Sequence, residues 1–191
     1  MDRPIAAYDL VVVDVETTGW LPAEAALTEI GAVRLNGGEL TGEFASLVRP
    51  LGPIPAEICE LTGITDDMVR LAPATATAMR AFLAFADGCM IVAHNAPFDL
   101  GFLTAACAAS GLDWPAAAVI DTAVLARMLL SPDDVPDYRL ATLARYFGAG
   151  TVPCHRALAD AKATADVLAG LLDLAARGRG VAPPAGLPLA S

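Results

Sequence analysis

Residues 11–19 read Val-Val-Val-Asp-Val-Glu-Thr-Thr-Gly, and this stretch decides how the rest of the chain is interpreted. Its apolar, β-branched start predicts a strand that is buried on both faces in the middle of a sheet. Because side chains alternate along a strand, Asp14 and Glu16 point to the same face. Two buried like charges are costly unless a cation lies over them, so the stretch predicts a site for divalent metal. The alternative is that the strand ends in solvent, where both acids are hydrated.

The composition favours one folded domain. The chain has 191 residues, of which 55% are hydrophobic, and this is enough for a substantial core. No apolar run approaches the ~20 residues of a membrane span, and the N-terminus does not resemble a secretory signal. We therefore expect a soluble, cytoplasmic protein without a membrane partner. The four cysteines show no C-x-x-C spacing, which argues against both a zinc cluster and a disulfide framework.

The charge balance restricts how the chain could bind nucleic acid. Twelve Lys and Arg residues stand against 22 acids, which gives a net charge of −10. A protein that follows a duplex normally carries a basic face. If nucleic acid is the substrate, we therefore expect a small footprint in which bound metal supplies much of the positive charge.

The order of the expected elements indicates an α/β fold. Three strands are expected at 8–16, 27–35 and 39–48, followed by two more at 89–93 and near 119–120. Helices are expected at 55–61, 74–86, 95–111 with Asn95 as its N-cap, 122–130, 138–147, and from 156 or 157 to about 176. Three antiparallel strands followed by β-α-β-α elements describe a mixed five-stranded sheet with helices on its faces. Residues 1–176 are expected to form the domain, and residues 177–191, rich in Gly, Pro and Ala, a flexible tail.

The last expected helix carries an acid on its apolar side. Asp160 shares one face with Thr164, Val167, Leu168 and Leu171, at spacings of i+4, i+7, i+8 and i+11. That face should pack against the sheet, so Asp160 needs a partner. A metal ion is one candidate, and a salt bridge or a helix cap is the other.

Both histidines of the chain lie next to candidate aspartates. His94 precedes Asp99, and His155 precedes Asp160 on the loop that enters the last helix. The first turn of a helix favours acids in any protein, so Asp99 alone carries little information. Together with Asp160 and the strand pair, however, it could converge on two hard divalent cations at one edge of the sheet. A structural role for both histidines is less convincing because both fall at this suspected site.

Three stretches combine these residues in a fixed order. They are Asp14-Val15-Glu16-Thr17-Thr18-Gly19, His94-Asn95-Ala96-Pro97-Phe98-Asp99 and His155-Arg156-Ala157-Leu158-Ala159-Asp160. In this order they resemble the three motifs of the DEDDh exonuclease family, which includes the proofreading subunit of bacterial replicative DNA polymerase, RNase T and oligoribonuclease. The resemblance covers about residues 8–172. It implies a ribonuclease H-like fold and 3′→5′ hydrolysis of single-stranded nucleic acid with two Mg²⁺ or Mn²⁺ ions.

The resemblance also implies roles for individual residues. The implied metal ligands, which are also catalytic, are Asp14, Glu16, Asp99 and Asp160. The implied general base is His155, which suits the role because the unperturbed pKa of histidine lies near neutrality. The expected substrate-binding residues are Thr17, Trp20, His94, Asn95 and Phe98. Among these, Thr17 matches a position that touches the terminal nucleotide, and Trp20 matches an apolar residue that lies against the last base.

The expected substrate is DNA, released as nucleoside 5′-monophosphates, and the expected partner is a DNA polymerase or a repair complex. Trimming of RNA 3′ ends and digestion of short oligoribonucleotides are the alternatives. Two other classes of protein are alternatives to a nuclease. One is a non-catalytic module that binds nucleic-acid ends, whose sequence should lack a carboxylate or the histidine. The other is a metal-dependent phosphatase for small phosphomonoesters.

Overall fold

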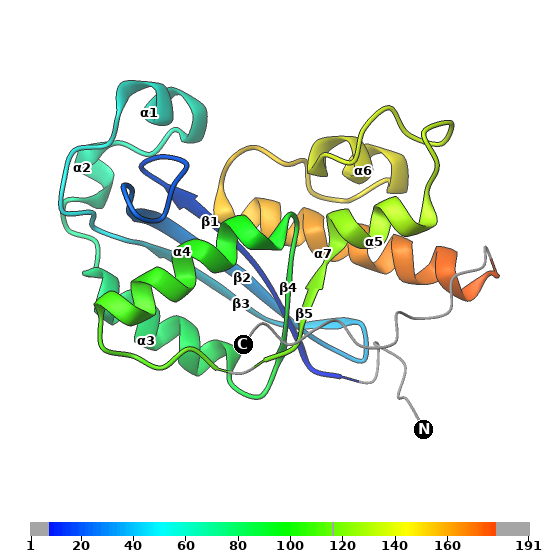
Figure 1. The fold of residues 1–191 in the computed structure, drawn as a ribbon, viewed down its shortest axis with the longest axis horizontal. Helices are drawn as coiled ribbons and strands as arrows, with labels where there is room; N and C mark the ends of the chain where they lie inside the picture. Colours follow the sequence, from blue (N-terminus) through cyan, green and yellow to red (C-terminus); the bar gives the residue numbers. More distant parts are fainter. Residues whose placement is uncertain (1–7, 116, 179–191) are drawn as a thin grey trace.

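A five-stranded sheet forms the centre of the computed structural model, which describes residues 8–115 and 117–178. The strands are β1 (Leu10–Thr17), β2 (Leu27–Asn36), β3 (Glu39–Leu47), β4 (Met90–Ala93) and β5 (Val119–Asp121). Their order in the sheet is β3-β2-β1-β4-β5. The first three strands are antiparallel neighbours, while β4 and β5 run parallel to β1 (Figure 1). The predicted mixed α/β sheet is therefore confirmed.

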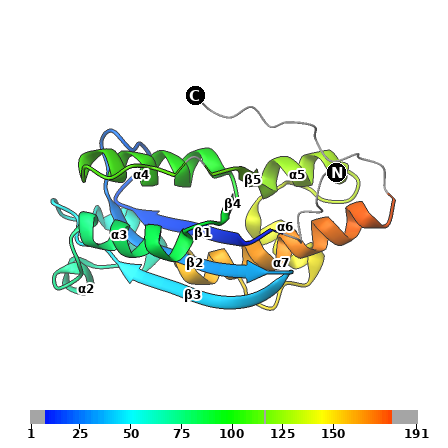
Figure 2. The ribbon, with the colours of Figure 1, turned by 90° about the horizontal axis from the view of Figure 1, so that it is seen from below.

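Helices pack on both faces of this sheet and against one another. They are α1 (Ala56–Thr62), α2 (Asp66–Val69), α3 (Thr75–Ala86), α4 (Ala96–Ala109), α5 (Thr122–Leu129), α6 (Leu140–Phe147) and α7 (Ala157–Ala176). Residues of α3 and α4 share one core cluster with the odd-numbered valines of β1. Leu10 and Val12 of β1 belong to another cluster together with Leu168 of α7. The strand is thus buried from both sides, with α4 and the first turns of α7 on opposite sides of it (Figure 2).

Two expected element starts are wrong. The first strand was expected from residue 8 but begins at Leu10, because its pairing with β2 and β4 begins there. The helix expected from residue 138 begins at Leu140. Ahead of it, the Tyr138 hydroxyl donates to the Leu130 carbonyl at 3.0 Å, and this bond holds the preceding segment as a loop.

The predicted N-cap of α4 is also wrong in its chemistry. Asn95 occupies the N-cap position, but its side chain makes no cap hydrogen bond and its backbone is left-handed, with φ at 62°. The free N–H groups of Asn95 and Ala96 instead donate to the Asp121 carboxylate at 3.1 and 3.0 Å. A carboxylate from β5 therefore replaces the local cap.

The composition predicted neither a membrane span nor a disulfide framework. Over the residues that the structure describes, no helix combines the length and the apolar character that crossing a bilayer requires. The four cysteines are free, so no disulfide framework is present. Apart from Arg177 and Gly178, the predicted tail 177–191 lies outside the described residues.

Helix α7 packs unusually close to β2 at its first turn. A Cβ atom placed on Gly31 would lie 2.1 Å from the backbone nitrogen of Leu158 and 2.2 Å from the carbonyl carbon of Ala157. Any side chain at this position would push the helix away from the sheet. Gly31 therefore sets the distance between β2 and the start of α7.

We expect Gly31→Ala to lower the free energy of unfolding by about 1–3 kcal/mol, the usual range for overpacking, or by more because the clash is with backbone. The measurement is urea denaturation. Gly52→Ala is the matched control, because a Cβ there would meet nothing within 4 Å. The control should change stability by less than about 0.5 kcal/mol. Equal stability of the two variants would contradict the close approach of α7.

Candidate active site

The C-terminal end of β1 opens into a cleft of about 210 Å³. Every residue that the sequence assigned to the site lines it: Asp14, Glu16, Thr17, Trp20, His94, Asn95, Phe98, Asp99, His155 and Asp160. They come from β1 and the turn after it, from the start of α4, and from the entry and first turn of α7. The structure therefore brings all three sequence motifs to one place, while the roles assigned to the residues stay predictions.

Backbone hydrogen bonds fix the two helical acids. Asp99 is 3% exposed, and its Oδ1 accepts the N–H of Val15 at 3.1 Å, which ties the first turn of α4 to β1. Asp160 is 7% exposed, and its Oδ1 accepts the N–H of Cys154 at 2.8 Å. Each bond engages Oδ1 and fixes the orientation of the carboxylate beside the cleft. Asp160 thus also stabilises the loop that precedes its own helix.

Burial, with added repulsion from neighbouring acids, raises the pKa values of these carboxyl groups. Burial, followed by the charges of Asp160 and Glu29, raises the pKa of Glu16 to about 8. Burial raises the pKa of Asp99 to about 8 against the opposing bond from Val15. For Asp14, burial and then the nearby charges of Asp99, Asp160 and Glu16 raise the pKa well above its ordinary value. Such a cluster of hard oxygen donors, whose charge Arg156 offsets only in part, suits divalent cations.

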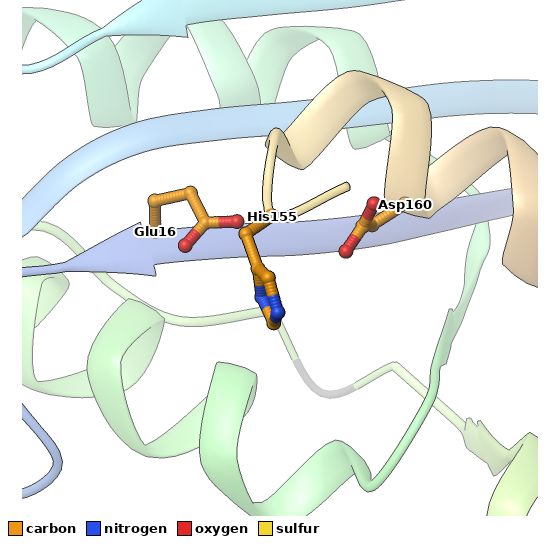
Figure 3. Close-up of side chains that lie close together, drawn as sticks. All are labelled: Glu16, His155 and Asp160. Carbon is orange, nitrogen blue, oxygen red and sulfur yellow. The ribbon is translucent and has the colours of Figure 1, made fainter. Parts of the chain in front are cut away.

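His155 lies beside two of the carboxylates. Glu16, His155 and Asp160 each offer a potential ligand atom, and these atoms lie within 4.8 Å of one another (Figure 3). His155 is exposed and has a left-handed backbone, with φ at 55°. This arrangement can do two things chemically, namely hold a cation or accept a proton next to one.

His94 is placed differently from His155. Its Nδ1 lies 2.9 Å from the Thr122 hydroxyl, which itself donates to the carbonyl of Ala93 at 3.4 Å. Burial lowers the pKa of His94, against the charge of Asp121 and a hydrogen bond with the backbone of Tyr138, which raise it. The contact with Thr122 thus fixes the ring of His94 at the wall of the cleft.

Three residues that support the site were missed in the sequence. Glu29 is buried next to Arg156, which binds it through two nitrogens, and Asp121 accepts N–H groups at the starts of both α4 and α5. Glu29 left a signal, because it is an acid within the apolar run Leu27–Leu35 that forms a strand. Asp121 stands directly before a predicted helix, the position of an N-cap, and could have been found in that way.

The family follows from a comparison of the sequence with family models. Residues 11–168 match the model described as exonuclease, the RNase T family. The chain belongs to this exonuclease family. The resemblance to DEDDh exonucleases drawn from the three motifs is thereby confirmed, and the chain is a hydrolase of the nuclease type.

Longer proteins contain segments similar to this exonuclease domain. The chain is 49% identical over 170 residues to a protein of Mycobacterium tuberculosis (strain CDC 1551 / Oshkosh) named as a candidate bifunctional exonuclease/endonuclease, MT2247, and the match covers 85% of the chain. It is 40% identical over 167 residues, or 87% of the chain, to the PolC-type DNA polymerase III of Bacillus subtilis (strain 168). The matches span only 26% and 12% of those relatives.

Solved structures show the same fold. Exonuclease X, in a complex with 5′-overhanging duplex DNA, aligns with a TM-score of 0.69 and 26% identity over 90% of this chain and 94% of that one. Exonuclease I of E. coli, in complex with a dT13 oligonucleotide, aligns with a TM-score of 0.77 and 21% identity over 89% of this chain and 42% of that one. The exonuclease domain thus has the predicted ribonuclease H-like fold.

The raised pKa values predict how the metal-free protein responds to pH. Glu16, whose ordinary pKa is 4.5, holds its proton more tightly when folded, up to about 8. Its contribution to stability is complete below the unfolded value and is lost as the pH rises through the folded value. We therefore expect the melting temperature in EDTA to fall from about pH 5 to about pH 8, and Mn²⁺ to raise it most at the upper end, where cations no longer compete with protons.

Asp14→Asn should make this fall shallower and raise the metal-free melting temperature at about pH 8, because it removes one of the repelling charges. Asp133→Asn, at an exposed loop position, is the control for a simple loss of charge and should follow the unsubstituted protein. A metal-free melting temperature that rises with pH over this interval would contradict the assigned repulsion.

Proposed function

We propose that the chain is a metal-dependent 3′→5′ exonuclease that removes nucleoside 5′-monophosphates from single-stranded DNA. The observation that carries the proposal is the convergence of four carboxylates and His155 on one cleft at the end of β1. No member of the set predicted from the motifs is missing or turned away from the cleft. This argues against a non-catalytic module that binds nucleic-acid ends.

The donor set fits two Mg²⁺ or Mn²⁺ ions. The four acids that would hold them, Asp14, Glu16, Asp99 and Asp160, offer only oxygen ligands, as these hard cations prefer. The raised pKa values of Asp14, Glu16 and Asp99 support a site at which positive charge is stabilised. Bound ions of this kind make water more acidic and neutralise the charge that develops on a phosphodiester.

The remaining residues orient the substrate and move a proton. His155, exposed next to Glu16 and Asp160, accepts the proton of the attacking water. Trp20 is 68% exposed at the cleft and offers a flat apolar surface to the terminal base. The Thr17 hydroxyl donates to the Gly19 carbonyl at 2.5 Å, which fixes the turn that carries Trp20.

The substrate class follows from size, charge and similarity. A cleft of about 210 Å³ on a protein of net charge −10 suits the end of a single strand better than the length of a duplex. Exonuclease X was solved with DNA, and several relatives are named DNA polymerase III, which supports DNA over RNA. The same relatives support a DNA polymerase or a repair complex as the partner, since their matching segment lies within a polymerase chain.

A direct assay tests the reaction. With Mg²⁺, 5′-labelled single-stranded DNA should shorten one nucleotide at a time, a circular single strand should stay intact, and EDTA should stop the reaction. The same RNA sequence should be cut more slowly. Cleavage of the circle would rule out an end-directed enzyme, and products that carry the 5′ label as mononucleotides from the start would reverse the direction. Hydrolysis of a small phosphomonoester alone would identify a phosphatase.

His155→Ala should lower kcat by about 10²–10⁴-fold, the usual range for loss of a positioned base. The melting temperature and the Mn²⁺ concentration for half-maximal activity should change little, because the side chain is exposed and the four carboxylates are retained. Val152→Ala is the matched control, since Val152 is 79% exposed on the same loop. A stable His155→Ala protein with full turnover would defeat the assignment.

A further inference from the structure

An ion pair between a buried carboxylate and a half-exposed arginine lies beside the candidate site and has no part in the reaction as proposed. Glu29 on β2 is 5% exposed and is paired in register with Glu16 on β1. Its carboxylate accepts hydrogen bonds from Nε and Nη2 of Arg156 at 3.0 and 2.7 Å. It also accepts the backbone N–H of Ala157 at 3.0 Å. Glu29 thus holds both residues that follow His155 in the chain.

Glu29 also replaces the local cap of α7. Arg156 stands at the N-cap position of this helix but makes no side-chain cap hydrogen bond. The carboxylate of Glu29 reaches the first N–H of the helix from another strand, where the helix dipole favours a negative charge. Two residues further along the same face of β2, Gly31 lets the helix backbone approach closely. The entry of α7 is therefore anchored to β2.

His155 lies between two residues that are each held by a contact with a carboxylate. On one side the N–H of Cys154 donates to Asp160, and on the other Arg156 is bound to Glu29. His155 itself has a φ of 55°, a left-handed conformation that an L-residue keeps only where its surroundings impose it. Without the Glu29 anchor the loop could relax to an ordinary conformation, and the imidazole would leave its place beside Glu16.

We propose that Glu29 and Arg156 are positioning residues, which hold His155 in its left-handed conformation and so place its imidazole for proton transfer. This inference rests on the proposed function, in which His155 is the proton acceptor. The planar fork of arginine suits the task, because two parallel bonds to one carboxylate fix its direction as well as its distance. A lysine would keep the charge but would lose the second bond.

The test is a double-mutant cycle with His155. Glu29→Gln and Arg156→Lys should each lower kcat by about 10–100-fold, since misplacement of a catalytic group by about 1 Å has effects of that size. KM and the Mn²⁺ dependence should stay near those of the unsubstituted protein. In the His155→Ala background the same changes should have no further effect on the residual rate, because they act through the missing ring. Two variants are used because Glu29→Gln alone could fail to fold.

Glu43→Gln is the matched control. It breaks another ion pair between the sheet and α7, that of Glu43 with Lys162 at 2.8 Å, and should keep full kcat. Hydrogen exchange gives a second readout that does not depend on activity. Exchange at residues 154–157 should become faster in Glu29→Gln and Arg156→Lys, with later turns of α7 unchanged, and should stay slow in Glu43→Gln.

The outcomes separate this inference from the proposed function. Equal loss of kcat with and without His155, or unchanged exchange at residues 154–157, would overturn the positioning role. If the unsubstituted protein cleaves no nucleic acid, the proposed function fails. In that case the exchange measurement alone decides whether Glu29 and Arg156 hold the loop.

Discussion

Repulsion among the carboxylates at the end of β1 is the constraint on which the rest of the structure depends. Four acids from three segments share one cleft. Burial makes all four more costly to ionise, and for Asp14 and Glu16 the charges of neighbouring acids add to that cost. The fold holds them with backbone hydrogen bonds, from Val15 to Asp99 and from Cys154 to Asp160. Packing on both faces of β1 supplies the remaining stabilisation. Any positive charge placed among these carboxylates would relieve their repulsion.

The sequence predicts local features well because they depend on neighbours in the chain. Alternation along one strand was enough to place Asp14 and Glu16 on the same face, and helical spacing was enough to place Asp160 toward the sheet. The supporting bonds depend on partners far away. Arg156 and Glu29 are separated by 127 positions, so the sequence pattern around one residue cannot predict its contact with the other. The predicted N-cap of α4 was wrong for the same reason, because the group that accepts the N–H of Asn95 is the Asp121 carboxylate on β5.

The negative charge of the chain is compatible with a nucleic-acid substrate if only a short piece of that substrate is bound. A net charge of −10 would oppose a long polyanion held along the surface, but it opposes a single strand end much less. The matching segments in the relatives lie within much longer proteins, of which this chain spans 26% and 12%. In such proteins other parts can hold the bulk of the nucleic acid while this fold handles the end.

The two helices that complete the site belong to different cores. The cluster that holds α4 contains Phe102 and Leu103, whereas Val167 and Leu171 of α7 pack with α5 and α6. Asp99 and Asp160 are therefore held together only as long as both halves of the molecule are docked on β1. Partial opening of either half, at a free-energy cost below that of global unfolding, separates the acids. On warming, activity should consequently be lost before secondary structure is. A cation bound by both Asp99 and Asp160 should oppose this opening, because it would connect the two halves of the molecule.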